Sequence, residues 1–359
     1  MDVFDRIGAD DYEQVVYCHD RGSGLRAIIA VHSTRLGPAL GGTRFYPYAT
    51  EDEGLEDVLR LARGMTYKAA AAGLDLGGGK AVIFGDPARD KSEAMLRAYA
   101  RYVDALGGRY LTAEDVGTTQ DDMDLVRRET RFVTGFSREL GGSGDPSAAT
   151  AYGVLWAMKA VAVHLWGHTS LAGRHVAVAG VGKVGRALVG HLVDEGARVS
   201  VADVTSAAVE AAVVDAGAEA VAVEKIHALD CDIYAPCALG GALNDVTIPE
   251  LRCAAVVGSA NNQLAHGRAS AELLADAGVV YAPDFVANAG GLINIAEELA
   301  PGGYHPDQAQ AAVRRIFDTV TSVLQAADVG AVTTAEAADR LAEDRIAALS
   351  AVHQIRPPT

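Results

Sequence analysis

The chain has 359 residues, half of them hydrophobic, and carries a formal net charge of -16. This length predicts two domains, and the apolar content is sufficient for a sizeable core. The acidic balance disfavours nucleic acid as a partner, because phosphate binding needs a basic surface.

The sequence gives no sign of a membrane span or of a secretory signal. The long apolar run 148–166 contains Lys159, whereas a span needs an uninterrupted apolar stretch. Residues 1–6 lack the basic region that precedes the apolar one in a signal peptide. The four cysteines form no Cys-x-x-Cys pair, so we expect reduced thiols. A soluble cytoplasmic protein with no membrane partner is the resulting expectation.

The first domain is expected to mix strands and helices over residues 1–140. The apolar run 25–31 predicts a strand, and residues 51–72 and 91–106 predict helices. The glycine-rich stretch 141–147, which contains a proline, is typical of a domain boundary or hinge.

Two lysines of this first domain are candidate functional residues. Lys68 lies on an apolar stripe of the predicted helix, and a cation on a core-facing surface favours an anionic partner. Lys80 follows three glycines and opens the strand-like run 81–84. Two ammonium groups close together in a dry cleft would lower the pKa of at least one, so that it could act as a base. Two exposed lysines beside a glycine-rich turn are the alternative. The stripe consists of Leu61, Met65, Lys68 and Ala72.

A further helix is expected from Ser147, which could cap it, to Trp166. His164 and His168 have the i,i+4 spacing of a metal site. However, no glutamate follows His164 as in a zinc-protease motif, and Gly167 is a helix stop between the two histidines. We therefore expect no metal.

The second domain is expected over residues 141–330, where short apolar runs alternate with helical segments. This alternation predicts a parallel sheet covered by helices on both faces. The runs are residues 175–179, 198–202, 231–235, 254–257 and 279–281. Residues 307–327 and 334–352 predict helices, and we expect residues 331–359 to pack back on the first domain, with C-terminal helices returning across the cleft.

A strand, a Gly-x-Gly-x-x-Gly sequence and a helix follow one another around Gly180, Gly182 and Gly185. This context predicts a Rossmann-type dinucleotide site, with the pyrophosphate at the helix N-terminus. The next strand ends at Asp203, which can accept from both ribose hydroxyls and would repel a 2′-phosphate, so NAD is expected over NADP. Lys183 in the loop weakens that preference slightly. A tight structural turn is the alternative.

Two polar sequences follow later strands, Asn261-Asn262-Gln263 and Asn288-Ala-Gly-Gly291. The strand C-termini of a doubly wound sheet are where ligands bind. Asparagine in an ordinary turn is the alternative, and the residues by themselves favour it.

The catalytic residues follow from combining the two domains. One lysine to bind a carboxylate, one to act as a base and the carboxylate of Asp115 to move protons would suit hydride transfer from an α-amino acid. Six motifs are recognisable between about residues 11 and 348. They are Leu36–Arg44, Gly64–Lys68, Leu76–Lys80, Thr112–Thr118, Tyr234–Ala238 and Tyr281–Gly291. These motifs strongly resemble the Glu/Leu/Phe/Val amino-acid dehydrogenase family, and within it the bacterial leucine and valine dehydrogenases.

The resemblance implies NAD-dependent, reversible oxidative deamination of an L-amino acid to a 2-oxo acid and ammonia. It implies that Lys68 binds the substrate carboxylate with backbone near Gly42, that Lys80 activates water, and that Asp115 shuttles protons. It also implies a homo-oligomer. The implied cofactor-binding residues are Gly180, Gly182, Lys183, Val184, Gly185, Asp203, Thr150, Asn261 and Asn288, and Asn261 would also contact the substrate.

The residues implied to form the side-chain pocket are all apolar, which favours the branched-chain substrates valine, leucine and isoleucine over glutamate. They are Leu40, Ala113, Leu292 and Ile295. A phenylalanine dehydrogenase of the same family is the alternative. A non-enzymatic NAD-binding regulator is a more remote one, because it would have lost Lys68, Lys80 or Asp115.

Overall fold

The computed structural model describes residues 3–352, and this part of the chain forms two compact units. The first runs up to Asp145 and includes Ile295–Pro306 and the residues from Ala342 onward; the second is Pro146–Asn294 with Asp307–Leu341. The segment after Asn294 was not expected in the first unit. It belongs there because the carboxylate of Glu298 accepts hydrogen bonds from the backbone N–H groups of Gly135 and Ser143.

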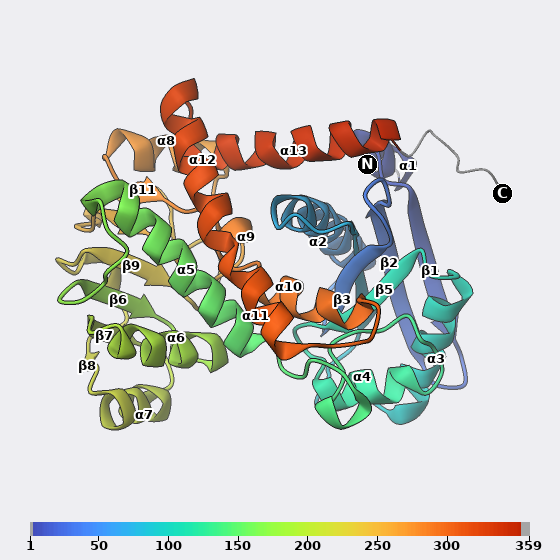
Figure 1. Ribbon diagram of the computed structural model, residues 1–359. Helices are drawn as coiled ribbons and strands as arrows, with labels where there is room; N and C mark the ends of the chain where they lie inside the picture. Colours follow the sequence, from blue (N-terminus) through green and yellow to red (C-terminus); the bar gives the residue numbers. More distant parts are fainter. Residues whose placement is uncertain (1–2, 353–359) are drawn as a thin grey trace. The chain divides into compact units, whose positions relative to one another are not determined.

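A five-stranded mixed sheet forms the centre of the first unit (Figure 1). The strand order is β1-β2-β4-β3-β5, in which β3, β4 and β5 are mutually parallel and β1 and β2 are antiparallel to their neighbours. The elements are α1 (Val3–Ala9), β1 (Gln14–Asp20), β2 (Leu25–Ser33), β3 (Ala39–Tyr46), α2 (Glu51–Ala71), β4 (Gly77–Phe84), α3 (Glu93–Ala105), β5 (Tyr110–Glu114), α4 (Gln120–Arg127) and the 3-10 turn η1 (Arg138–Leu140).

Both faces of this sheet are buried, and β2 shows why. Ile28 and Ala30 pack in the cluster under α2, whereas Ile29 and Val31 pack in the cluster under α3. An apolar run without polar alternation suits such a strand. The predicted strand and the two predicted helices of this unit are confirmed as β2, α2 and α3, and serine or threonine side chains cap both helices.

Two details of the lysine region differ from expectation. The strand was expected to begin at Lys80, but β4 begins three residues earlier and includes the three glycines, where a Cβ at Gly78 would collide with backbone of Thr66 in α2. The stripe that carries Lys68 is half-buried and only borders the core of α2. The face of α2 that is fully buried instead includes Leu55, Val58, Leu59, Ala62, Thr66, Ala69 and Ala70.

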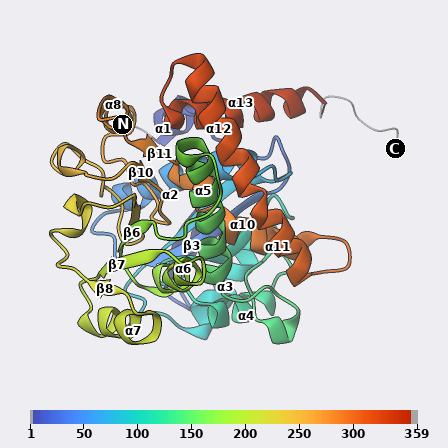
Figure 2. The ribbon, with the colours of Figure 1, turned by 60° about the vertical axis from the view of Figure 1, so that its left-hand side comes forward.

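The second unit contains the predicted parallel sheet, in the order β11-β10-β9-β6-β7-β8. Figure 2 shows β6, β7 and β8 side by side. The elements, in chain order to the C-terminus, are α5 (Ser147–Trp166), β6 (His175–Ala179), α6 (Lys183–Asp194), β7 (Arg198–Ala202), α7 (Ser206–Ala216), β8 (Glu219–Ala220), η2 (Ile226–Ala228), β9 (Ile233–Pro236), η3 (Ile248–Glu250), β10 (Ala255–Val256), α8 (Arg268–Asp276), β11 (Val280–Tyr281), α9 (Asp284–Ala287), α10 (Gly290–Ala296), η4 (Glu297–Leu299), α11 (Pro306–Arg314), α12 (Ile316–Gly330) and α13 (Thr334–Val352).

Helix α5 is long and apolar enough to cross a membrane, but half of its most apolar window is buried inside the protein, and the helix packs against α6 and α12. It begins at Ser147, although Pro146 occupies the cap position and no side chain caps the helix, so Ser147 does not have its expected role. Its end at Gly167 is as predicted: this glycine has φ 78° and terminates the helix before His168.

The part of α13 that belongs to the first unit packs on α2. Ala342, with Ile346 beside it, contacts the cluster formed by Leu36 and Ala70. Arg345 donates to the carbonyl oxygens of residues 73 and 74, just beyond the end of α2. The helix therefore supports the turn that leads from Lys68 to the glycines of β4.

Candidate active site

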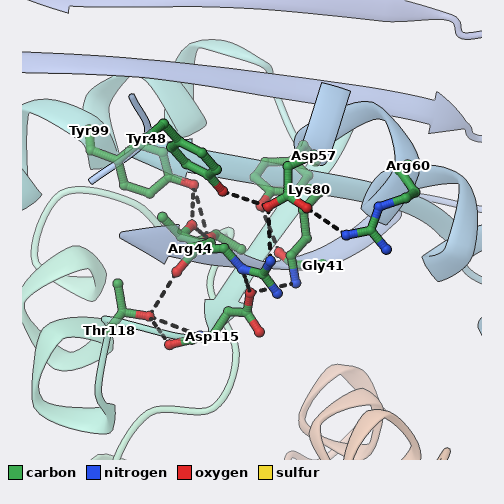
Figure 3. A network of polar contacts seen from close by, with 12 residues as sticks. Gly41, Arg44, Tyr48, Asp57, Arg60, Lys80, Tyr99, Asp115 and Thr118 are labelled. Carbon is green, nitrogen blue, oxygen red and sulfur yellow. Dashed lines mark hydrogen bonds and ion pairs between the residues drawn. The ribbon is translucent and has the colours of Figure 1, made fainter. Parts of the chain in front are cut away.

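Lys80 and Asp115 form a buried ion pair on the α2 side of the first unit's sheet. The Lys80 side chain is 7% exposed, and its Nζ lies 3.0 Å from Oδ2 of Asp115 (Figure 3). Lys80 comes from the middle of β4, and Asp115 directly follows β5. The parallel register of the strands brings these sequence-predicted residues together, although they are far apart in the chain.

Gly42 of β3 makes room for this pair. It lies opposite Ala113 of β5 in the register. A Cβ at Gly42 would lie 2.9 Å from the Cβ of Asp115 and would collide with the carbonyl oxygen of Glu114. A side chain at this position would therefore displace the strand end that carries Asp115.

A second cation, Arg44, which the sequence did not single out, also contacts Asp115. Arg44 Nε lies 3.0 Å from Asp115 Oδ2, and Arg44 Nη1 lies 2.8 Å from Asp57 Oδ2. Tyr48 donates its hydroxyl to the same Asp57 oxygen at 2.6 Å, and Arg60 contacts the other oxygen at 2.7 Å (Figure 3). The only signal in the sequence was that Arg44 ends a recognisable motif.

The environment keeps Asp115 ionised. Burial by itself would raise the pKa of Asp115, but Lys80 and Arg44 outweigh burial and hold this pKa below its ordinary value. The backbone is also fixed, because the Asp115 N–H donates to Thr118 Oγ1 and the Thr118 hydroxyl donates to the carbonyl oxygen of Thr43. Protonation of Asp115 must therefore overcome the stabilisation that the two cations give to its charged form.

Lys68 lies half-buried near the C-terminal end of α2. Lys80 is paired with a carboxylate, so the lysine base expected from the sequence stays a prediction, tested below. Of the expected pocket residues, Leu40 and Ala113 are buried on the sheet of the first unit, and Ile295 is buried in the same unit. Leu292 is buried in α10 within the second unit.

The glycine loop of the second unit has the geometry of a phosphate-binding turn. Gly180 has φ 102°, and a Cβ at Gly185 would collide with the carbonyl oxygen of Gly180. A Cβ at Gly182, in contrast, would meet nothing within 4 Å, so its backbone is open to a ligand. Gly182 is the N-cap of α6 and provides no side-chain cap. The first N–H groups of this helix therefore suit an anion.

Asp203 lies directly beside this loop. Its Oδ2 accepts from the N–H of Val181 at 2.8 Å, and its Oδ1 accepts from the N–H of Thr205 at 2.8 Å. Burial opposes ionisation of Asp203, but these backbone donors outweigh it and lower the pKa. A fixed, negatively charged acceptor after β7 therefore lies beside the loop, as expected for a group that binds ribose hydroxyls.

The polar residues after β10 form a network of amides. Asn288 Nδ2 donates to Asn261 Oδ1 at 2.8 Å and to the carbonyl oxygen of Ser259 at 3.0 Å. Asn288 is buried, whereas Asn261 is exposed, so Asn288 orients Asn261. Asn262 has φ 52°, which fits the turn alternative. The hydroxyl of Thr150 donates to the carbonyl oxygen of Pro146 in the first turn of α5.

Gln263, the last residue of the first polar sequence, has a structural role. Its side chain is fully buried and donates to the carbonyl oxygens of Gly258 and Ala260.

Among residues 3–352, no three His, Cys, Asp or Glu side chains are grouped in a way that could hold a metal ion.

Comparison with known families covers nearly the whole chain. Residues 12–132 match the Glu/Leu/Phe/Val dehydrogenase, dimerisation domain, and residues 141–216 and 204–353 match the Glutamate/Leucine/Phenylalanine/Valine dehydrogenase domain. The chain belongs to the Glu/Leu/Phe/Val dehydrogenase family.

Individual members of this family are similar over nearly their full length. A leucine dehydrogenase of Bacillus cereus is 54% identical over 349 residues, covering 97% of this chain and 94% of that protein. A valine dehydrogenase of Streptomyces virginiae is 55% identical over 340 residues, covering 93% of this chain and 94% of that protein. The crystal structure of L-tryptophan dehydrogenase from Nostoc punctiforme matches with a TM-score of 0.84 and 42% identity, covering 97% of this chain and 100% of that one. The family expected from the sequence motifs is thereby confirmed.

Proposed function

We propose that this protein catalyses the reversible, NAD-dependent oxidative deamination of branched-chain L-amino acids to 2-oxo acids and ammonia. The observation that carries the proposal is the buried Lys80–Asp115 pair. It lies in a chain that is 54% identical to a leucine dehydrogenase. Two adjacent proton-transferring groups on a largely apolar strand surface suit chemistry at the α-carbon and nitrogen of an apolar amino acid.

The second unit has residues that fit NAD, which when bound would supply the hydride acceptor. The open backbone at Gly182 suits the pyrophosphate. The fixed carboxylate of Asp203 suits the ribose hydroxyls and repels a 2′-phosphate. Further cofactor contacts are assigned to Gly180, Lys183, Val184, Gly185, Thr150, Asn261 and Asn288.

In the first unit, Lys68 binds the substrate carboxylate with the backbone near Gly42. Asp115 accepts a proton from the amino nitrogen and returns it during the reverse reaction. Lys80 acts as the base that activates the water attacking the imine carbon. The contact between Lys80 and Asp115 gives a direct route by which a proton can pass between them.

Substrate choice is assigned to Leu40, Ala113, Leu292 and Ile295, all apolar and buried. Asn261 is assigned as a further substrate contact. A side-chain carboxylate would find no partner among these apolar groups, and burying it unpaired would cost several kcal/mol. Glutamate is therefore excluded by charge, whereas phenylalanine is excluded only by volume, which side chains can relieve by repacking.

The deciding experiment follows NADH absorbance with NAD and valine, leucine, isoleucine, phenylalanine, tryptophan and glutamate in turn. We expect the three branched-chain substrates to have the highest kcat/KM and glutamate to be negligible. A preference for phenylalanine would support the alternative of a phenylalanine dehydrogenase. NADH binding without turnover of any substrate would support a non-enzymatic regulator instead.

The match of residues 12–132 to a dimerisation domain supports a homo-oligomer. Analytical ultracentrifugation of the purified protein tests this, and a monomer at micromolar concentration would contradict it. We also propose a cytoplasmic location, which cell fractionation tests.

A further inference from the structure

Arg44 and Lys80 contact the same oxygen of Asp115. Both Arg44 Nε and Lys80 Nζ lie 3.0 Å from Oδ2 (Figure 3). Within residues 3–352, the Asp115 carboxylate makes its side-chain contacts through Oδ2, and its other oxygen, Oδ1, accepts no hydrogen bond. The side chain is 21% exposed, so Oδ1 is the oxygen left for an external partner.

We propose that Arg44 is a positioning residue for proton transfer: it holds Asp115 by Oδ2, so that Oδ1 exchanges the proton with the substrate nitrogen. This inference rests on the proposed function. It assigns a role to a residue that contacts neither substrate nor cofactor in the proposed mechanism.

Arg44 is itself held in a fixed orientation. Asp57 accepts from its Nη1, and the hydroxyl of Tyr48 donates to the same Asp57 oxygen, while Arg60 binds the other one. A planar guanidinium can contact two carboxylates in defined directions, which the single ammonium of a lysine cannot do. The chain Asp57–Arg44–Asp115 therefore fixes the plane of the catalytic carboxylate as well as its charge.

The charges around Asp115 predict opposite effects for two substitutions. Arg44 favours ionisation of Asp115, and Asp57 offsets part of the Arg44 charge. Removal of the Arg44 charge should therefore raise the pH at which Asp115 ionises, and removal of the Asp57 charge should lower it. The ionisable groups on the surrounding elements are Lys80 on β4, Arg44 on β3, Tyr48 after β3, Asp57, Arg60 and Lys68 on α2, and Tyr110 and Glu114 on β5.

Two of these neighbours have shifted pKa values of their own. Burial, the hydrogen bond to Asp57 and the Asp57 charge raise the pKa of Tyr48, which keeps its hydroxyl neutral. Burial opposes ionisation of Asp57, but the hydrogen bond from Tyr48 and the charges of Arg44 and Arg60 lower its pKa. Asp57→Asn therefore removes a carboxylate whose charged form the folded protein favours.

The test compares Arg44→Gln, Arg44→Lys, Asp57→Asn and the wild type, each full-length and with NAD bound. Infrared spectra of the carboxyl band, with the Asp115→Asn spectrum subtracted, give the ionisation midpoint of Asp115 without any turnover. The pH dependence of kcat for valine deamination gives the same midpoint during catalysis. Arg60→Gln is the matched control, because Arg60 contacts Asp57 but not Asp115.

We expect Arg44→Gln to raise the Asp115 midpoint by about one pH unit or more, and to move the acid limb of kcat with it. Asp57→Asn should lower the midpoint, and Arg60→Gln should move it less than Arg44→Gln does. Arg44→Lys should leave the Asp115 midpoint close to the wild-type value, because the positive charge remains. It should lower kcat by a larger factor than it changes KM, because the Asp115 carboxylate is no longer held in its orientation.

An unchanged midpoint in Arg44→Gln, or shifts of the same sign in Arg44→Gln and Asp57→Asn, would overturn the role of Arg44. A wild-type protein that turns over none of the amino acids would instead refute the proposed function, and the infrared midpoints would distinguish the two failures. Should Arg44→Gln not fold, the comparison of Asp57→Asn with Arg44→Lys decides, and a midpoint equal to wild type in both would overturn the proposal.

Discussion

Lys80 can be tested against a half-buried lysine of the same unit that is also paired with a carboxylate. Lys91 pairs with Asp122 at 2.6 Å, in a contact that stabilises the start of α4. We expect Lys80→Ala to abolish nearly all turnover while NADH binding, measured by fluorescence titration, is unchanged. Lys91→Ala should lose stability but keep its activity. Substantial turnover in Lys80→Ala would remove Lys80 from the mechanism.

Asp203 determines the cofactor prediction. Because both of its oxygens are fixed by backbone N–H groups, the carboxylate cannot turn away from a 2′-phosphate without losing those bonds. We therefore expect a strong preference for NAD over NADP. Asp203→Ser should reduce the preference for NAD over NADP, mainly by changing the affinities for the two cofactors. Kinetics with both cofactors measure this, and equal kcat/KM values for the wild type would contradict the prediction.

Leu40 determines the specificity prediction. It is fully buried on β3, next in register to Gly78 and Leu111. Shortening it to alanine should free volume and shift the preference from valine toward leucine and phenylalanine. A methylene in an apolar pocket is worth about 1–3 kcal/mol, so a shift of tenfold or more in the kcat/KM ratio is expected. An unchanged ratio would show that Leu40 does not line the pocket.

At the level of the strands, two glycines of the first unit should respond to alanine in opposite ways. Gly42→Ala would push against Glu114 and the Cβ of Asp115, so we expect a large loss of kcat with NADH binding retained. Gly64 lies in α2, and a Cβ there meets nothing within 4 Å. Gly64→Ala should therefore stabilise the protein by about 0.5–1 kcal/mol. Chemical denaturation and steady-state kinetics on both proteins check this, and full activity of Gly42→Ala would contradict it.

These elements also show what the sequence could and could not predict. Regular patterns located α2, α3, β2 and the parallel strands of the second unit, because burial on a helix face or on both sides of a strand leaves a periodic trace. Strand β3 was not predicted, since its glycines suit close approach by neighbouring backbone and interrupt the apolar pattern.

The candidate active site, like the fold, could be predicted from the sequence only in part. Motifs identified Lys80 and Asp115, but the network through Arg44 depends on how β3, β4 and α2 pack. Asp57 is one of several acidic residues near the start of α2, and nothing in the sequence distinguishes it from those that remain in solvent. Only the spatial arrangement shows that it holds the arginine.

At the scale of the whole molecule, Asp115 should link pH to the stability of one unit only. Its pKa is lower in the folded protein than in the unfolded chain, because Lys80 and Arg44 outweigh the effect of burial. Such a group stabilises the folded state above its unfolded pKa, and the contribution is lost as the pH falls through the folded value. At neutral pH, Asp115→Asn should cost about 3 kcal/mol, since it leaves two half-buried or buried cations without their partner.

Two probes can separate the units in this experiment. Both tryptophans, Trp156 and Trp166, lie in α5 of the second unit, so their fluorescence follows that unit, whereas far-UV circular dichroism follows both. At pH 7, Asp115→Asn should lower the denaturant midpoint seen by circular dichroism more than the one seen by fluorescence. The difference in denaturant midpoint between variant and wild type should shrink below about pH 4, where Asp115 of the unfolded wild-type chain begins to take up a proton that the folded state does not yet bind. If this difference in denaturant midpoint stays constant from pH 7 to pH 3, Asp115 stabilises the first unit through its packing and not through its charge.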